Sequence, residues 1–128
     1  MKFLLDTHAL LWFLDGDARL SSSARALIEN PHHELFVSVA SLWEIAIKVS
    51  LGKLTLIAPF ETLFPEQLNH NRIEVLGISL EHLHQVTRLP FHHRDPFDRL
   101  LLAQAQVEDW PLISVDAVFD LYAVSRQW

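Results

Sequence analysis

Short apolar runs alternate with segments of helical spacing along almost the whole chain. Four runs are mainly apolar, without the regular alternation of a half-exposed strand, and predict strands at 2–5, 35–39, 73–78 and 111–115. The intervening segments repeat apolar residues every three or four positions and predict helices at 8–14, 24–29, 41–51, 59–69, 79–89 and 96–107. A last short strand is expected at 122–124. This alternation is typical of an α/β fold with a parallel sheet covered on both faces.

Turn-forming and capping residues lie at the boundaries of these elements. Asp15-Gly16-Asp17 follows the first helix, Ser21-Ser22-Ser23 can cap the second, and Gly52 follows the third. Pro65 lies inside the 59–69 segment and can split that helix. Because no repeat, low-complexity tract or Gly/Ser linker interrupts the chain, we expect a single domain over residues 1–128.

The composition narrows the possible classes of protein. Half of the 128 residues are apolar and none is cysteine, which excludes a disordered chain, disulfides, thiolate zinc sites and thiol nucleophiles. The lack of cysteine, of a signal segment and of a membrane-spanning run predicts a cytoplasmic protein with no membrane contact. The 10 basic and 16 acidic residues give a net charge of −6, which argues against a broad basic surface for nucleic acid.

Acidic residues follow the predicted strands. Asp6 ends the first strand, Glu44 lies in the first turns after the second, and Asp116 ends the fourth. Asp95 and Asp98 begin the helix that leads into the fourth strand. Ligands of parallel α/β sheets bind beyond the carboxyl ends of the strands, so we expect at least three of these carboxylates to meet at one edge.

Each acid also has a simpler explanation as part of a helix cap. Ser41-Leu42-Trp43-Glu44 matches a capping box, and Asp95-Pro96 matches a cap followed by proline at the first helical position. Capping does not require the acids to converge, however, and converging carboxylates repel one another. A divalent cation removes that repulsion, and an all-oxygen site without cysteine favours Mg²⁺ or Mn²⁺ over Zn²⁺. Since Mg²⁺ often also binds phosphate oxygens, the pattern indicates a phosphoester substrate.

Four segments around these acids resemble the PIN-domain family, and within it the short VapC-type ribonuclease toxins. They are FLLDTHALLW, SVASLWEIAIK, HHRDPFDRLLLAQA and PLISVDAVFDLY, in the family's order and spanning nearly the whole chain. The resemblance implies a three-layer α/β/α fold with a central, mainly parallel five-stranded sheet. It also implies a carboxylate pocket that holds one or two Mg²⁺ ions and hydrolyses RNA phosphodiester bonds as an endoribonuclease.

Position by position, the resemblance assigns the catalytic and metal-binding roles to Asp6, Glu44, Asp98 and Asp116. Asp95 is an alternative to Asp98 or an additional ligand, and Asp120 lies close to Asp116. Thr7 and Ser114 match hydroxyl positions beside the acids, where they could orient a ligand or a water molecule.

Basic and apolar residues suggest the contacts that such a nuclease would make. Arg94 and Arg99 lie in the third segment, where holding an RNA phosphate and ordinary surface pairing are equally open interpretations. Residues 11–14 and 63–65 carry more apolar surface than one sheet face can cover. The resemblance implies two uses for such surface, a homodimer contact and a groove for the C-terminal segment of a cognate antitoxin.

Three alternatives compete with the nuclease interpretation. The eight histidines raise the possibility of a zinc site, but pairs such as His92-His93 lack the spacing that places two ligands on one helical face, so we expect solvated surface histidines. A phospho-receiver domain needs a second acid beside Asp6 and a lysine late in the chain, and both are missing. The third alternative is a catalytically silent PIN-fold binding module, against which the presence of all four acids argues.

Overall fold

A five-stranded sheet forms the centre of the protein in a computed structural model that describes residues 1–128. The strand order is β3-β2-β1-β4-β5, and all four pairings are parallel. The parallel five-stranded sheet expected from the sequence is therefore confirmed. The strands are β1 (Lys2–Leu5), β2 (Glu34–Ser38), β3 (Ile73–Leu76), β4 (Leu112–Ile113) and β5 (Arg126–Gln127).

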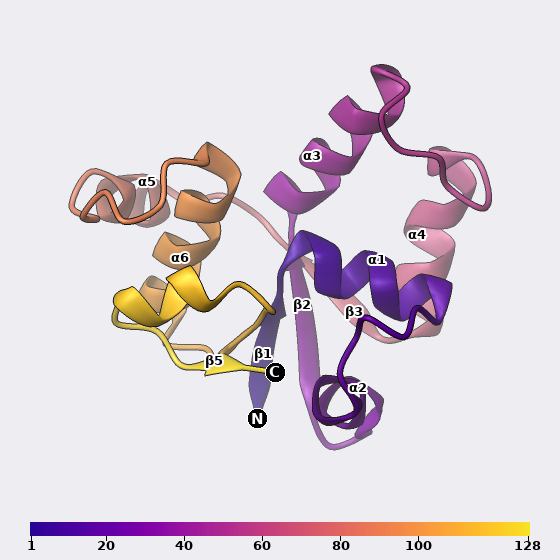
Figure 1. The fold of residues 1–128 in the computed structure, drawn as a ribbon, viewed down its shortest axis with the longest axis horizontal. Helices are drawn as coiled ribbons and strands as arrows, with labels where there is room; N and C mark the ends of the chain where they lie inside the picture. Colours follow the sequence, from indigo (N-terminus) through magenta and orange to yellow (C-terminus); the bar gives the residue numbers. More distant parts are fainter.

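Helices cover both faces of the sheet, as Figure 1 shows. Successive strand residues point to opposite faces, so Leu5 packs in one core cluster and its neighbour Leu4 in the other. The cluster with Leu5 draws on the first four helices, and the cluster with Leu4 on α6 and the 3₁₀ helix η1. The helices are α1 (Thr7–Asp15), α2 (Ser22–Glu29), α3 (Val39–Ser50), α4 (Phe60–His70), α5 (Leu80–Val86), α6 (Pro96–Glu108) and η1 (Ala117–Leu121).

Most of the predicted elements are present, but two are placed differently. The strand expected at 122–124 is absent, and β5 lies at Arg126–Gln127 instead. Tyr122 belongs to the core, where its hydroxyl donates to the Pro90 carbonyl at 2.8 Å. Helix α3 begins at Val39, earlier than expected, because the Ser38 hydroxyl accepts from the Ala40 N–H and caps it.

The interruption expected in the fourth helix is confirmed. Phe64 has φ −114° and ψ 110°, outside the helical region, immediately before Pro65. The kink lets Leu63 and Phe64 pack into the core, so this segment does not form the exposed apolar surface expected from the sequence. No helix in the protein is both long enough and apolar enough to cross a bilayer.

Candidate active site

A small acidic cavity lies at the carboxyl ends of β1 and β4, between the starts of α1 and α6 and the second turn of α3. Its volume is about 180 Å³, enough for an ion with several water molecules. The five acids singled out in the sequence converge on it from four separate segments of the chain. The cavity is lined by Asp6, Thr7, His8, Glu44, Lys48, Asp95, Asp98, Val115 and Asp116.

Asp6 follows β1 directly and is 5% exposed. Its Oδ1 accepts a hydrogen bond of 2.7 Å from the Ala9 N–H, so the residue also caps α1. Burial raises the pKa of Asp6, and hydrogen bonds from the Ser114 hydroxyl and the Ala9 N–H partly offset that rise. The carboxylate that ends the first strand is thus costly to ionise without a cation nearby.

Glu44 reaches the cavity from the second turn of α3. Its Oε1 accepts a hydrogen bond of 2.8 Å from the Thr7 hydroxyl, and its Oε2 lies 3.1 Å from the Lys48 ammonium. The capping-box interpretation of Ser41 and Glu44 is wrong, because Ser38 caps the helix and Glu44 is the sixth helical residue. Its carboxylate is held by two side chains, so helix capping no longer explains its position.

Asp95 and Asp98 both line the cavity, but in different roles. Asp95 caps α6, since its Oδ1 accepts from the Phe97 and Asp98 N–H groups at 2.9 and 3.0 Å. Burial raises the pKa of Asp98 from 3.8 to about 7, and the charge of Asp95 is the next largest cause. The pKa of Asp98 is therefore raised first by burial and then by the negative charge of its neighbours.

Asp116 follows β4 and caps η1. Its Oδ1 accepts from the Val118 N–H at 3.0 Å, and its own N–H donates to the buried Ser114 hydroxyl at 3.0 Å. Asp120, the neighbouring candidate, forms two hydrogen bonds of 2.9 Å with the Arg126 guanidinium and does not line the cavity. Of the two, only Asp116 is placed to hold a metal ion with the other acids.

His93 belongs to this cluster, although its sequence context indicated a solvated histidine. Its Nε2 lies 3.1 Å from Asp98 Oδ2 and 2.9 Å from Asp116 Oδ2. His82 is also buried rather than solvated, at 1% exposure, with its Nε2 2.9 Å from Glu108 Oε1. The one local signal for His93 is its place two residues before Asp95, the cap of α6.

The two arginines differ in their surroundings. Arg99 is 6% exposed and donates to the carbonyls of residues 86, 89, 90 and 93 at 2.9 to 3.3 Å. Its guanidinium also stacks 3.9 Å from the centre of the Phe91 ring. Arg99 therefore holds the loop before α6, so neither interpretation left open by the sequence, a phosphate contact or surface pairing, describes its position. Arg94 is exposed beside the cluster and stays available for a phosphate.

The residues of the cavity suit a hard divalent cation. Carboxylate oxygens dominate the lining, and no thiol is present in the chain. Ligating carboxylates in proteins are normally oriented by further hydrogen bonds, and donors already contact Asp6, Glu44, Asp98 and Asp116 here. The acids could hold a metal ion, whose charge would offset the burial and the neighbouring negative charges that raise the pKa of Asp98.

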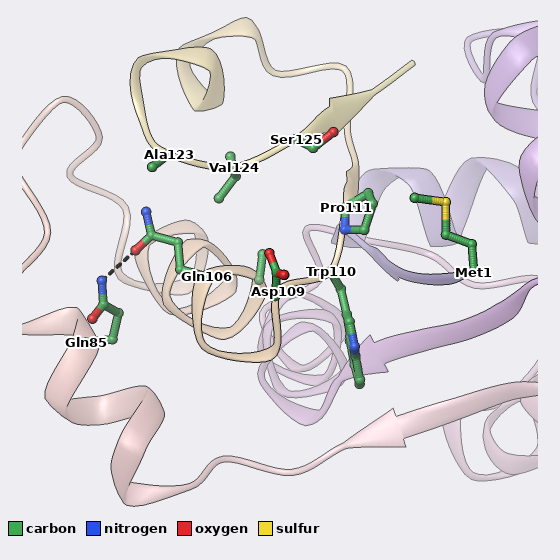
Figure 2. Close-up of a pocket in the computed structure, with 10 residues that line it drawn as sticks. Met1, Gln85, Gln106, Asp109, Trp110, Pro111, Ala123, Val124 and Ser125 are labelled. Carbon is green, nitrogen blue, oxygen red and sulfur yellow. Dashed lines mark hydrogen bonds between the residues drawn. The ribbon is translucent and has the colours of Figure 1, made fainter.

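A larger hollow, of about 790 Å³, lies at the opposite ends of the strands. Figure 2 shows Trp110, Pro111 and Val124 on its walls and a hydrogen bond between Gln85 and Gln106, which measures 2.6 Å. Its lining holds one carboxylate and no basic side chain, whereas five acids line the smaller cavity. The smaller cavity is therefore the candidate active site.

A parallel sheet with an acidic cavity at its carboxyl edge is the arrangement that the resemblance to the PIN family implies. Residues 3–125 match the PIN domain family, to which the chain belongs. Within that family it groups with the VapC-type ribonucleases. The chain is 30% identical over 114 residues to Ribonuclease VapC22 of Mycobacterium tuberculosis, which covers 88% of this chain and 85% of that protein. It is 31% identical over 67 residues to Ribonuclease VapC16 of the same organism, and this match covers 52% of this chain and 46% of that protein.

Solved structures of toxin–antitoxin complexes share the fold. VapBC2 from Rickettsia felis bound to a DNA fragment from its promoter matches with a TM-score of 0.72 and 15% identity, over 99% of this chain and 98% of that one. VapBC-1 from nontypeable Haemophilus influenzae matches with a TM-score of 0.67 and 16% identity, over 99% of this chain and 97% of that one. The predicted PIN-like α/β/α architecture is confirmed.

Proposed function

We propose that the protein is a Mg²⁺-dependent endoribonuclease that acts as the toxin of a toxin–antitoxin pair. The observation that carries this proposal is the convergence of Asp6, Glu44, Asp98 and Asp116 on one cavity of about 180 Å³. Membership of the PIN family and similarity to proteins named as VapC ribonucleases support it. Mn²⁺, which prefers similar oxygen ligands, would serve in place of Mg²⁺.

The four acids would hold the ion, and their neighbours keep them in place. A divalent ion in such a site polarises a phosphoryl oxygen, lowers the pKa of water and stabilises negative charge on the leaving oxygen. The Thr7 hydroxyl and the Lys48 ammonium hold the Glu44 carboxylate. The Ser114 hydroxyl accepts from the Asp116 backbone N–H and lowers the pKa of Asp6. The exposed Arg94 would contact a neighbouring RNA phosphate.

The reaction needs no covalent nucleophile from the protein. Water attacks the phosphorus atom, the bond from phosphorus to the 3′ oxygen breaks, and that oxygen takes up a proton. The products are a 3′-hydroxyl end and a 5′-phosphate end. The phospho-receiver alternative needs a second acid beside Asp6 at the end of β1. Thr7 follows Asp6 instead, and the Thr7 hydroxyl is hydrogen-bonded to Glu44.

The partners proposed for this chain are RNA, a cognate antitoxin and a second copy of itself. Two of its structural neighbours are VapBC complexes, and another is FitAB bound to a DNA fragment. The crowded carboxylates of the cavity would attract a basic antitoxin segment. Exposed apolar side chains such as Trp43, Leu80 and Leu121 offer surface for protein contacts.

The test uses protein purified free of any antitoxin and incubated with a labelled single-stranded RNA. We expect cleavage with Mg²⁺, none with a chelator, and products that carry 5′-phosphates. Asp6→Asn should abolish cleavage, whereas the matched control Asp120→Asn, at an acid bound to Arg126 outside the cavity, should retain it. Equal RNA loss in Asp6→Asn would refute the nuclease mechanism. No cleavage of any RNA by a folded, metal-binding protein would favour the silent binding module.

A further inference from the structure

We propose that His93 is a positioning residue of the acidic site, whose ring holds Asp98 and Asp116 at the separation that a shared divalent ion requires. Its Nε2 lies 3.1 Å from Asp98 Oδ2 and 2.9 Å from Asp116 Oδ2, and the three atoms lie within 4.8 Å of one another. This inference rests on the proposed metal-dependent function, but it concerns a residue outside the four acids.

Hydrogen bonding determines which ring nitrogen of His93 carries the proton. The Asp95 backbone N–H donates to Nδ1 at 3.3 Å, and a backbone N–H can only donate. Nδ1 therefore presents its lone pair to Asp95, and the proton of the neutral ring is on Nε2. In this tautomer the Nε2–H group donates to Asp116 Oδ2 and lies 3.1 Å from Asp98 Oδ2, and Nε2 has no lone pair to offer a metal ion.

The His93 ring is held in this orientation by its surroundings. Its backbone N–H donates to the Tyr122 hydroxyl at 2.7 Å, which in turn donates to the Pro90 carbonyl at 2.8 Å. The ring also packs against Phe119, with centroids 5.5 Å apart. Arg99 holds the same loop through hydrogen bonds to four carbonyls. A loop held at both ends and in the middle is suited to presenting one side chain accurately.

The two carboxylates come from separate parts of the chain, and the His93 ring is a donor that lies beside both. Asp98 is on α6 and Asp116 follows β4, and each remains partly exposed, at 30% and 35% of the side chain. Without a shared donor, their mutual repulsion would separate them. A donor between them sets their spacing before an ion binds, which lowers the cost of assembling the site.

The experiment measures the affinity of purified, metal-stripped protein for Mn²⁺ and Mg²⁺ by calorimetry. We expect His93→Ala to weaken binding by about 10- to 100-fold, and His93→Gln, whose amide can donate from a similar position, to recover most of that loss. His84→Ala, at an exposed histidine on α5, is the matched control and should bind like wild type. Tyr122→Phe removes only the hydroxyl that holds the His93 backbone, and it tests the same idea if His93→Ala does not fold; a several-fold loss is expected.

Spin-echo spectroscopy of bound Mn²⁺ supplies a second measurement. A positioning residue leaves no directly coordinated ¹⁴N signal, so detection of such a signal that disappears in His93→Ala would overturn the proposal and make His93 a ligand. Wild-type affinity in folded His93→Ala, or in Tyr122→Phe where His93→Ala does not fold, would also overturn it while leaving the metal site intact. If wild-type protein binds neither ion, the proposed function itself fails.

Discussion

Neutralising Asp98 should stabilise the metal-free protein while it destroys the metal site. The change is Asp98→Asn, which keeps an oxygen to accept from His93 Nε2 but removes the negative charge. Burial and the charge of Asp95 raise the pKa of Asp98 from 3.8 to about 7. An acid with a raised pKa contributes stability that is fully present below its unfolded value and is lost as the pH rises through the folded value.

The size of the effect follows from the same shift. The rise in the pKa of Asp98 from 3.8 to about 7 corresponds to at most about 4 kcal/mol of lost stability when Asp98 is ionised, at about 1.36 kcal/mol for each pKa unit. The Asp98 side chain is 30% exposed, so water screens part of that cost. We therefore expect Asp98→Asn to raise the free energy of unfolding by about 1–2 kcal/mol at pH 8, or the melting temperature by about 3–10 °C. The gain should shrink as the pH falls from 7 toward 4.

Urea titrations with a chelator present, at pH 5 and pH 8, measure this difference. Asp120→Asn is the control, because the hydrogen bond from Arg126 lowers the pKa of Asp120 and its neutralisation should bring no gain. Added Mg²⁺ should stabilise wild type and not Asp98→Asn, since only binding to the folded state shifts the equilibrium. Equal stability of wild type and Asp98→Asn at pH 8, or the same gain at both pH values, would refute the electrostatic reasoning.

Three further substitutions separate structural from functional roles around the cavity. Arg99→Lys should lower the free energy of unfolding by about 2–3 kcal/mol, because an ammonium cannot bond four carbonyls as the guanidinium does. An unchanged midpoint of urea unfolding would contradict this role of the Arg99 guanidinium. Arg94→Ala should leave that stability unchanged and weaken RNA binding several-fold at low salt, measured by anisotropy in the Asp6→Asn background, and retained affinity would exclude a phosphate contact. Asp95→Asn should keep the cap of α6 and lower the pKa of Asp98 in an NMR titration, whereas an unmoved pKa would show that the Asp95 charge has no influence there.

Elements with strong local signals were predictable from the sequence. β1 and β2 are apolar runs buried on both faces, and α6 begins at a cap followed by proline, as Asp95-Pro96 indicates. β5 was not predictable in its place, because Arg126 and Gln127 carry no apolar pattern and are a strand only through pairing with β4. The apolar residues near 122–124 suggested a strand, but Tyr122 is buried in the core instead.

The residues of the candidate site also divide into those that a local sequence signal marks and those that only the fold reveals. Asp6 and Asp116 were identifiable because each follows a strand. The roles of Glu44, in the second turn of α3, and of Asp98 rather than Asp95 also needed the resemblance to the PIN family. The contact of His93 with Asp116 joins residues 23 positions apart, and no local pattern marks it. Ser38 and Ser41 are both plausible caps in sequence, and only the end of β2 at Ser38 decides between them. Arg99 looked like a surface base because nothing nearby in sequence shows that a loop folds over it.

The order in which the chain is made has a consequence for the cell that makes it. The cavity needs Asp6 near one end of the domain and Asp116 near the other, and the Ser114 backbone beside Asp116 is itself held by Arg126 and Gln127 in β5. A partly synthesised chain therefore holds isolated carboxylates but no complete cavity. The proposed nuclease therefore cannot form while the ribosome is still translating the middle of its message, so an unfinished chain cannot cleave RNA.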